Sequence, residues 1–271
     1  MNHLNIFAKV FLKRSSILVL LVGLLGGALL QAQPTNPLNA AADPLRVAQY
    51  PKTDTFFPGK GPFQHGYWFE KLWAERRTEF WRRRQQDKGA VVFLGDSITQ
   101  GWKDLATAFP NLKTANRGIS GDTTRGVLYR LKDDVIDLDP AAVVLLIGTN
   151  DLGLHGDPKD AAENVRAILE ELSKAAPRTP VIVCNVMPSD PSKDRPPDRI
   201  KALNAQVDEI IKQNPNWIRC DTWSIYANAE GNCTQGEFPD LLHPNSTGYA
   251  KWTAALNPVF ARLSLPARKA E

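Results

Sequence analysis

Short, unbroken runs of apolar residues, separated by longer segments with helical periodicity, limit the folds open to this chain more than any other feature of its sequence. The clearest runs cover residues 91–94 and 142–147, and residues 181–186 form a third that only Asn185 interrupts. They are rich in β-branched residues and too short for helices, so they predict strands that are buried on both faces. Residues 112–116 and 217–220 are weaker candidates of the same kind.

The segments between these runs repeat apolar residues at the spacing of an amphipathic helix. Helices are expected over residues 65–84, 123–132, 159–175, 199–213 and 246–263. Asp122 precedes the second of these helices and is its expected N-cap. Strands that alternate with helices pair into a parallel sheet covered by helices on both faces. The sequence therefore predicts an α/β fold of three layers, α/β/α, with a five-stranded parallel sheet in a flavodoxin-like order.

The first 32 residues have the layout of a secretory signal peptide. Lys9, Lys13 and Arg14 precede an apolar run over residues 17–30, and Leu30-Gln31-Ala32 is a suitable cleavage site. The run is shorter than the roughly 20 apolar residues that span a bilayer, so cleavage is favoured over a membrane anchor. We therefore expect a secreted or periplasmic protein with no stable membrane insertion after cleavage.

The rest of the chain divides into a proline-rich segment and one folded domain. Residues 33–62 show little periodicity and are expected to form a linker or a strap over the surface, and residues 63–271 to form the domain. Residues 1–32 hold three of the 33 Lys and Arg and none of the 29 Asp and Glu, so the remainder is almost neutral. This balance argues against a nucleic-acid partner. The arginine-rich run over residues 76–84 is expected to be a solvated helix face rather than an anion site.

The three cysteines, Cys184, Cys220 and Cys233, are not spaced like the ligands of a metal ion. Export permits a disulfide, and Cys220–Cys233 is the favoured pair because Cys184 lies in a predicted buried strand. We expect a structural role for all three. No metal ion or cofactor is expected, and no G-x-G-x-x-G or P-loop motif follows a predicted strand to indicate a nucleotide.

Four polar clusters follow the predicted strands or precede the last helix. They are Gly95-Asp96-Ser97, Gly118-Ile119-Ser120-Gly121, Gly148-Thr149-Asn150-Asp151 and Asp240-Leu241-Leu242-His243. We expect them to converge, because the loops at the carboxyl ends of parallel strands share one rim. Their chemistry is complementary: Ser97 is a candidate nucleophile and His243 the base that would activate it. Asp240 can accept the other imidazole N–H and hold the tautomer.

Acyl transfer also needs hydrogen-bond donors directed at the developing oxyanion. The candidates are the backbone N–H groups of Ser97 and Gly121 and the side-chain amide of Asn150. Taken one at a time, these clusters are better explained by helix caps and tight turns. His155 competes for the role of base, but its place just beyond Asn150 favours a rim or capping position. His65 is expected to be structural.

Together, the four clusters resemble the sequence blocks of the SGNH (GDSL-type) hydrolase superfamily, over about residues 68–260. Within this range, residues 118–125 with 128–131, and Leu242-His243 with Gly248-Tyr249-Ala250-Lys251, are similar to the catalytic subunits of brain-type platelet-activating-factor acetylhydrolase. The resemblance implies the SGNH hydrolase fold. It also implies the following roles: Ser97 as nucleophile, Asp240 and His243 as its partners, and Gly121 and Asn150 as oxyanion donors.

The leading hypothesis is a secreted serine esterase that removes short acyl groups, acetyl in particular, from a carbohydrate or a similar polar ester through an acyl-enzyme. A lysophospholipase or thioesterase for longer acyl chains is a second enzyme hypothesis. A third is a non-catalytic SGNH domain that binds a glycan or a protein through the strap. The complete set of Ser97, Asp240 and His243 argues against this third hypothesis.

Overall fold

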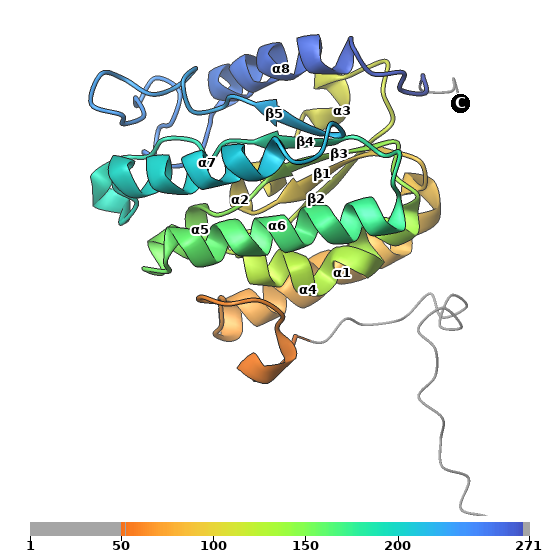
Figure 1. The fold of residues 1–271 in the computed structure, drawn as a ribbon, viewed down its shortest axis with the longest axis horizontal. Helices are drawn as coiled ribbons and strands as arrows, with labels where there is room; N and C mark the ends of the chain where they lie inside the picture. The colour runs from red at the N-terminus through yellow and green to blue at the C-terminus, as the bar shows by residue number, and fades with distance from the viewer. Residues whose placement is uncertain (1–49, 52, 268–271) are drawn as a thin grey trace, which may run out of the picture. The chain divides into compact units, whose positions relative to one another are not determined.

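The computed structural model describes residues 50–51 and 53–267. The predicted signal peptide and most of the predicted linker lie outside these residues. Within them, five strands form one parallel sheet in the order β2-β1-β3-β4-β5 (Figure 1). The strands are β1 Val91–Gly95, β2 Thr114–Gly118, β3 Ala142–Leu146, β4 Val181–Cys184 and β5 Trp217–Cys220. The predicted α/β/α fold with a flavodoxin-like strand order is confirmed.

Helices cover both faces of this sheet (Figure 1). Helices α4, α6 and α7 lie on one face and α3 and α8 on the other, while α1 contacts α4 and the edge strand β2. The α-helices are α1 Tyr67–Asp87, α2 Ser97–Gln100, α3 Leu105–Ala108, α4 Thr124–Asp134, α5 Thr149–Gly153, α6 Pro158–Ala175, α7 Pro197–Ile211 and α8 Ser246–Phe260. The described residues also form three short 3-10 helices, η2 Asp54–Phe56, η3 Ile136–Leu138 and η4 Pro191–Lys193.

Strand β1 lies in the interior of the sheet and explains why its sequence is apolar at every position. Val92 and Leu94 pack into the core beneath α4, α6 and α7, whereas Val91 and Phe93 pack into the core beneath α8. The strand ends at Gly95, where a Cβ would lie 2.3 Å from the carbonyl oxygen of Leu146. Only glycine therefore fits at the point where the chain turns from β1 into α2.

Strand β2 begins and ends two residues later than predicted. It pairs with β1 residue for residue up to Gly118, which lies opposite Gly95. Leu112, which we expected to begin the strand, instead forms an isolated antiparallel bridge with Ala267. The end of the strand was not predicted because it contains the polar Arg117. The burial of Arg117 depends on an ion pair with Asp87, 2.8 Å away.

Two expectations about charged residues near α1 and α4 are corrected. The N-cap of α4 is Thr123, whose hydroxyl accepts from the backbone N–H of Gly126. Asp122 is instead fully buried in an ion pair of 2.7 Å with Arg130. The arginine-rich run is also only partly a solvated face: Arg82 and Arg83 are exposed, but Arg77 is partly buried and pairs with the carboxylate of Asp134 at 3.0 Å.

The predicted Cys220–Cys233 disulfide is wrong, because all three cysteines are buried free thiols. Cys220 lies directly opposite Cys184 in the register of β4 and β5. The thiol of Cys233 donates to the carbonyl oxygen of Leu241 at 3.3 Å. Whether two cysteines lie opposite each other on adjacent strands depends on the strand register, which cannot be read from the spacing of the cysteines in the sequence.

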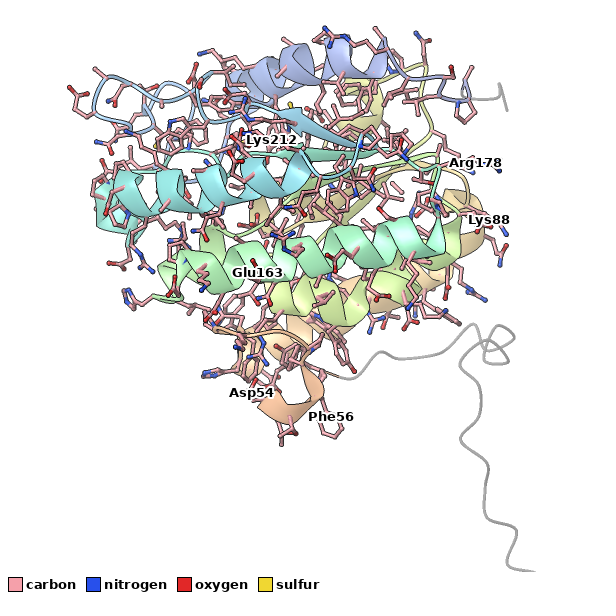
Figure 2. The ribbon with its side chains drawn as sticks, viewed as in Figure 1. Asp54, Phe56, Lys88, Glu163, Arg178 and Lys212 are labelled. Atoms are coloured by element: carbon pink, nitrogen blue, oxygen red, sulfur yellow. The ribbon has the colours of Figure 1, made fainter. Side chains whose placement is uncertain are left out.

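The described end of the proline-rich segment, residues 53–62, lies against α4 and α6 as a strap. The guanidinium of Arg125 donates to the carbonyl oxygens of Phe57, Pro58 and Gly61 at 2.8–3.1 Å. Asn164 exchanges two hydrogen bonds with the backbone of Lys60. Figure 2 shows Asp54 and Phe56 at the outer end of this strap. No helix in the described part of the chain is long and apolar enough to cross a membrane.

Candidate active site

The candidate nucleophile, Ser97, is the first residue of α2 and is separated from the end of β1 at Gly95 by Asp96 alone. Asp96 caps this short helix by accepting from the backbone N–H of Ile98 at 2.9 Å. On the other side, Tyr249 of α8 donates to the carbonyl oxygen of Ile98 at 2.8 Å. The serine is thus held at the carboxyl edge of the sheet, where parallel sheets place their ligands.

A continuous hydrogen-bond chain joins Ser97, His243 and Asp240. The Nε2 atom of His243 lies 2.8 Å from the Ser97 hydroxyl, and its Nδ1 atom lies 2.6 Å from Oδ2 of Asp240. The other carboxylate oxygen, Oδ1, accepts from the backbone N–H groups of His243 and Leu242 at 2.7 and 3.1 Å. Asp240 can therefore only accept from Nδ1–H, which leaves the Nε2 lone pair directed at the serine.

These contacts also set the charge of Asp240. Partial burial raises the pKa of this carboxyl, but the hydrogen bonds from the His243 side chain and backbone outweigh burial and bring the pKa to about 2. Asp240 is therefore a carboxylate at neutral pH. It can stabilise the imidazolium that forms when His243 takes a proton.

The two predicted oxyanion donors outside α2 lie next to each other. Gly121 has a φ of 86°, in the region that favours glycine, and the amide of Asn150 donates to the neighbouring Asp122 carbonyl at 2.9 Å. The loop that carries Gly121 is joined to α2, because Gln100 accepts from the backbone N–H of Ser120 at 2.6 Å. The structure thus brings Ser97, Gly121 and Asn150 to one rim.

Three buried carboxyls lie beneath this rim: Asp96, Asp122 and Asp151. Burial raises the pKa of Asp96 and of Asp151 to about 7, and it also raises that of Asp122 despite the ion pair with Arg130. Asp151 accepts from the backbone N–H and the hydroxyl of Thr124 at 3.0 and 2.5 Å. One carboxyl oxygen of Asp96 is buried and has no hydrogen-bond partner among the residues that the structure describes.

The other two histidines considered from the sequence take no part in the chain of contacts at Ser97. His155 lies just beyond α5, exposed and with a left-handed φ of 61°. His65 is also exposed, with its ring 5.9 Å from that of Phe63. Of these three histidines, His243 is the one whose ring lies within hydrogen-bond distance of Ser97.

Two residues at the rim were missed by the sequence analysis. Arg195, in the loop between η4 and α7, donates to Oδ1 of Asn150 at 3.1 Å and to the carbonyl oxygen of Thr149 at 2.8 Å. Trp68, at the start of α1, lies against Gly121: a Cβ on that glycine would be 2.8 Å from the indole ring. Neither residue belongs to a polar cluster that follows a strand, and no other feature of the sequence places them at the rim.

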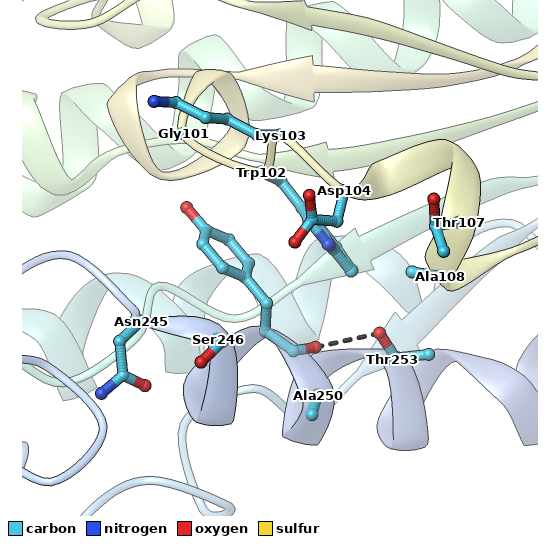
Figure 3. A pocket seen from close by; sticks show the side chains of 11 residues that line it. Gly101, Trp102, Lys103, Asp104, Thr107, Ala108, Asn245, Ser246, Ala250 and Thr253 are labelled. Atoms are coloured by element: carbon cyan, nitrogen blue, oxygen red, sulfur yellow. Dashed lines mark hydrogen bonds between the residues drawn. The ribbon is translucent and has the colours of Figure 1, made fainter.

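A groove of about 530 Å³ lies beside the site, between the end of α2, α3 and the first half of α8 (Figure 3). It is lined by Gly101, Trp102, Lys103, Asp104, Thr107, Ala108, Asn245, Ser246, Tyr249, Ala250 and Thr253. None of Ser97, Gly121, Asn150 and His243 is among these residues. The groove therefore lies beside the candidate site and is not lined by these four residues.

A fold of this kind with a serine, a histidine and an aspartate at its carboxyl rim defines a class of hydrolases, and comparison with known proteins agrees. The chain belongs to the GDSL-like lipase/acylhydrolase family, which matches residues 93–251. It is therefore a hydrolase of the acylhydrolase and esterase type, as expected.

Among curated relatives, platelet-activating factor acetylhydrolase IB subunit alpha2 of Homo sapiens is 27% identical over 202 residues, which cover 70% of this chain and 84% of the relative. Among solved structures, a GDSL-like lipase from Bacteroides thetaiotaomicron is 25% identical with a TM-score of 0.60, covering 68% of this chain and 97% of that one. An acetyl xylan esterase shares the fold, with a TM-score of 0.51 at 22% identity over 62% of this chain and 98% of the other.

Proposed function

We propose that this chain is a secreted or periplasmic serine esterase that removes short acyl groups, acetyl in particular, from carbohydrate esters. The observation that carries the proposal is the hydrogen-bond chain from Ser97 through His243 to Asp240, with contacts of 2.8 and 2.6 Å. A serine hydroxyl becomes a good nucleophile when such a base is within hydrogen-bond distance.

The reaction has two halves. The Oγ atom of Ser97 attacks the ester carbonyl carbon while its proton passes to Nε2 of His243, and the negative oxygen that forms faces Gly121 and Asn150. The bond to the alcohol then breaks, and the alcohol leaves with the proton from His243. Water next attacks the acyl-serine while His243 takes a proton from it. The bond to Ser97 breaks, Ser97 regains its proton, and the carboxylic acid leaves.

Acetyl as the acyl group is supported by the relatives. The human relative is named an acetylhydrolase, and one structural neighbour is named an acetyl xylan esterase. The second name also gives a polysaccharide, xylan, as the molecule that carries the acetyl group.

Exposed aromatic residues beside the oxyanion donors support a carbohydrate as the alcohol part. Trp68 is 55% exposed although one edge of its ring lies against Gly121, and Tyr67 next to it is 82% exposed. The alcohol part of the ester must lie close to these donors while its bond breaks. An exposed indole at this place offers the apolar face of a sugar ring a surface to stack on, while the hydroxyls of the sugar stay in water.

The acyl group is tested with p-nitrophenyl acetate, butyrate and octanoate. We expect kcat/KM to fall steadily along the series. A long apolar acyl groove would give the opposite result, because each buried methylene contributes about 0.8 kcal/mol, or about fourfold per carbon. A maximum at octanoate would contradict the proposal and favour a lysophospholipase or thioesterase. Failure to hydrolyse any of the three esters would favour a non-catalytic binding domain.

The alcohol part is tested with Trp68→Ala on an acetylated xylo-oligosaccharide and on p-nitrophenyl acetate. Loss of one aromatic contact should lower kcat/KM on the oligosaccharide by roughly 3–10-fold and leave p-nitrophenyl acetate within about twofold. Phe56→Ala is the matched control, because Phe56 is 66% exposed on the strap and is not the ring against Gly121. An equal loss on both substrates, or an equal effect of Phe56→Ala, would contradict the carbohydrate assignment.

A further inference from the structure

Arg195 contacts Asn150, a candidate oxyanion donor, although no step of the proposed reaction involves Arg195 itself. It lies partly buried in the loop between η4 and α7. Among the described residues, its guanidinium donates three hydrogen bonds: from Nε to the carbonyl of Thr149, from Nη2 to Oδ1 of Asn150, and from Nη1 to the carbonyl of Lys193. The guanidinium also crosses Gly153, where a Cβ would lie 2.5 Å from it. The end of α5 is thus shaped to admit this side chain.

The two partners of the Asn150 side chain determine which way its amide points. Oδ1 faces the guanidinium of Arg195, which can only donate, and Nδ2 faces the carbonyl oxygen of Asp122, which can only accept. Turning the amide by 180° would place N–H against N–H at Arg195 and oxygen against oxygen at Asp122. Both hydrogen bonds would be lost, and Asn150 is only 9% exposed, so little water is available to replace them.

This arrangement leaves one hydrogen of the Asn150 amide unassigned. Nδ2 carries two hydrogens, and the Asp122 carbonyl takes one of them. With Oδ1 held by Arg195, the second N–H has a single direction open to it. A positive charge on the carbonyl side of an amide also polarises it and strengthens the opposite N–H as a donor.

We propose that Arg195 is a positioning residue, which holds the amide of Asn150 so that its second N–H meets the oxyanion. The assignment rests on the proposed esterase function. Arg195 acts through Asn150 and does not touch the substrate. Its effect should therefore vanish when Asn150 is absent.

A double-mutant cycle on p-nitrophenyl acetate tests this dependence. Asn150→Ala should lower kcat by about 10²–10³-fold, as loss of one oxyanion donor does elsewhere. Arg195→Met should lower kcat by about 10–100-fold with KM within about twofold, and Arg195→Lys should recover part of the loss. The double variant Asn150→Ala/Arg195→Met should be no slower than Asn150→Ala alone, within about twofold.

Two results would overturn the assignment. Multiplied losses in the double variant would mean that Arg195 acts independently of Asn150. A raised KM with unchanged kcat for Arg195→Met would mean that the guanidinium binds the substrate.

Arg199→Met is the matched control. Arg199 also donates to a backbone carbonyl near the end of α5, that of Gly156, but it does not contact Asn150. It should keep kcat within about twofold, because loss of one partly exposed hydrogen bond affects stability and leaves Asn150 in place. A fall in kcat equal to that of Arg195→Met would mean that general loosening of this region explains both variants.

A measurement without substrate separates this proposal from the esterase function. The side-chain amide resonances of Asn150, assigned as those lost in Asn150→Ala, should be resolved and slow to exchange in the unaltered protein. In Arg195→Met they should shift and exchange faster, whereas Arg195→Lys should lie between the two. Unchanged Asn150 resonances in Arg195→Met would contradict the positioning role even if every variant proved inactive on esters.

Discussion

At the scale of single residues, Asp240 controls the tautomer of His243 because its two carboxylate oxygens have different hydrogen-bond partners. Oδ1 is committed to two backbone N–H groups, so only Oδ2 is left for Nδ1 of His243. A carboxylate has one acceptor oxygen for the backbone N–H groups and another for Nδ1. An amide cannot, because one of its ends is a donor.

Asp240→Asn should therefore nearly abolish activity while leaving the fold intact. The amide oxygen must stay with the backbone N–H groups, so the amide nitrogen would face Nδ1 and donate to it. The remaining imidazole proton would then lie on Nε2, where it blocks transfer from Ser97. We expect kcat on p-nitrophenyl acetate to fall by about 10⁴-fold. A fall of less than about tenfold would show that the tautomer is not set by Asp240.

Asp151 makes the stability of the domain depend on pH. Burial raises its pKa to about 7, whereas an unfolded aspartate titrates near 3.9. Between these values the folded state binds more protons than the unfolded state. The contribution of Asp151 to stability is therefore fully present below about pH 4 and is lost as the pH rises to about 7.

Asp151→Asn removes this titration and should flatten the dependence of the melting temperature on pH. The flattening is expected between about pH 4 and 7, the window set by the two pKa values. Asp96, whose pKa is also about 7, still titrates, so some slope should remain. Thermal unfolding of both proteins at several pH values measures the effect. Parallel profiles across this window would contradict the account.

At the scale of elements, Arg130 ties α4 to the ends of the two strands that present the site. Its guanidinium is fully buried, pairs with Asp122, and donates to the carbonyl oxygens of Gly95 and Arg117 at 3.1 and 2.9 Å. One side chain thus holds the carboxyl ends of β1 and β2 together. Those ends carry Ser97 and the loop of Gly121.

Arg130→Met should lower the free energy of unfolding by about 3–5 kcal/mol, because it leaves the buried Asp122 carboxylate without its partner. Chemical denaturation gives the value. Arg82→Met is the control, since Arg82 is exposed on α1 and its loss should change stability by no more than about 0.5 kcal/mol. A loss below about 1 kcal/mol for Arg130→Met would mean that water or other donors satisfy Asp122.

The same elements show what could be predicted from the sequence. Residues 91–94 and 142–147 are apolar throughout, and only a strand buried on both faces suits such short runs, so β1 and β3 were predictable. Arg117 and Asp122 are buried because their partners lie elsewhere in the chain, and this hid the end of β2 and the true N-cap of α4. Arg195 meets Asn150 across 45 residues of sequence, and no local pattern reports such a contact.

At the scale of the whole molecule, the order of strands brings three of the four polar clusters together. The carboxyl ends of β1, β2 and β3 lie side by side, so the clusters that follow them share one rim. The fourth cluster lies in the loop before α8, from which His243 comes within 2.8 Å of Ser97. The convergence of the first three clusters was predictable from topology alone. The placement of Cys220 opposite Cys184 was not, because it depends on the register of β4 and β5.

The expected export of the protein can be tested on the molecule as its native host makes it. If residues 1–32 are a cleaved signal peptide, mass spectrometry of the exported fraction should find a chain that begins close to Gln33. Intact Met1 in a membrane fraction would instead establish an uncleaved anchor.

The turnover of p-nitrophenyl acetate by three purified, folded variants tests whether His243 activates Ser97. Ser97→Ala and His243→Ala should each lower kcat by about 10⁴-fold or more, because neither residue can work without the other. His155→Ala should keep kcat within about twofold, because His155 lies exposed beyond α5. Near-normal turnover by folded His243→Ala would contradict the account.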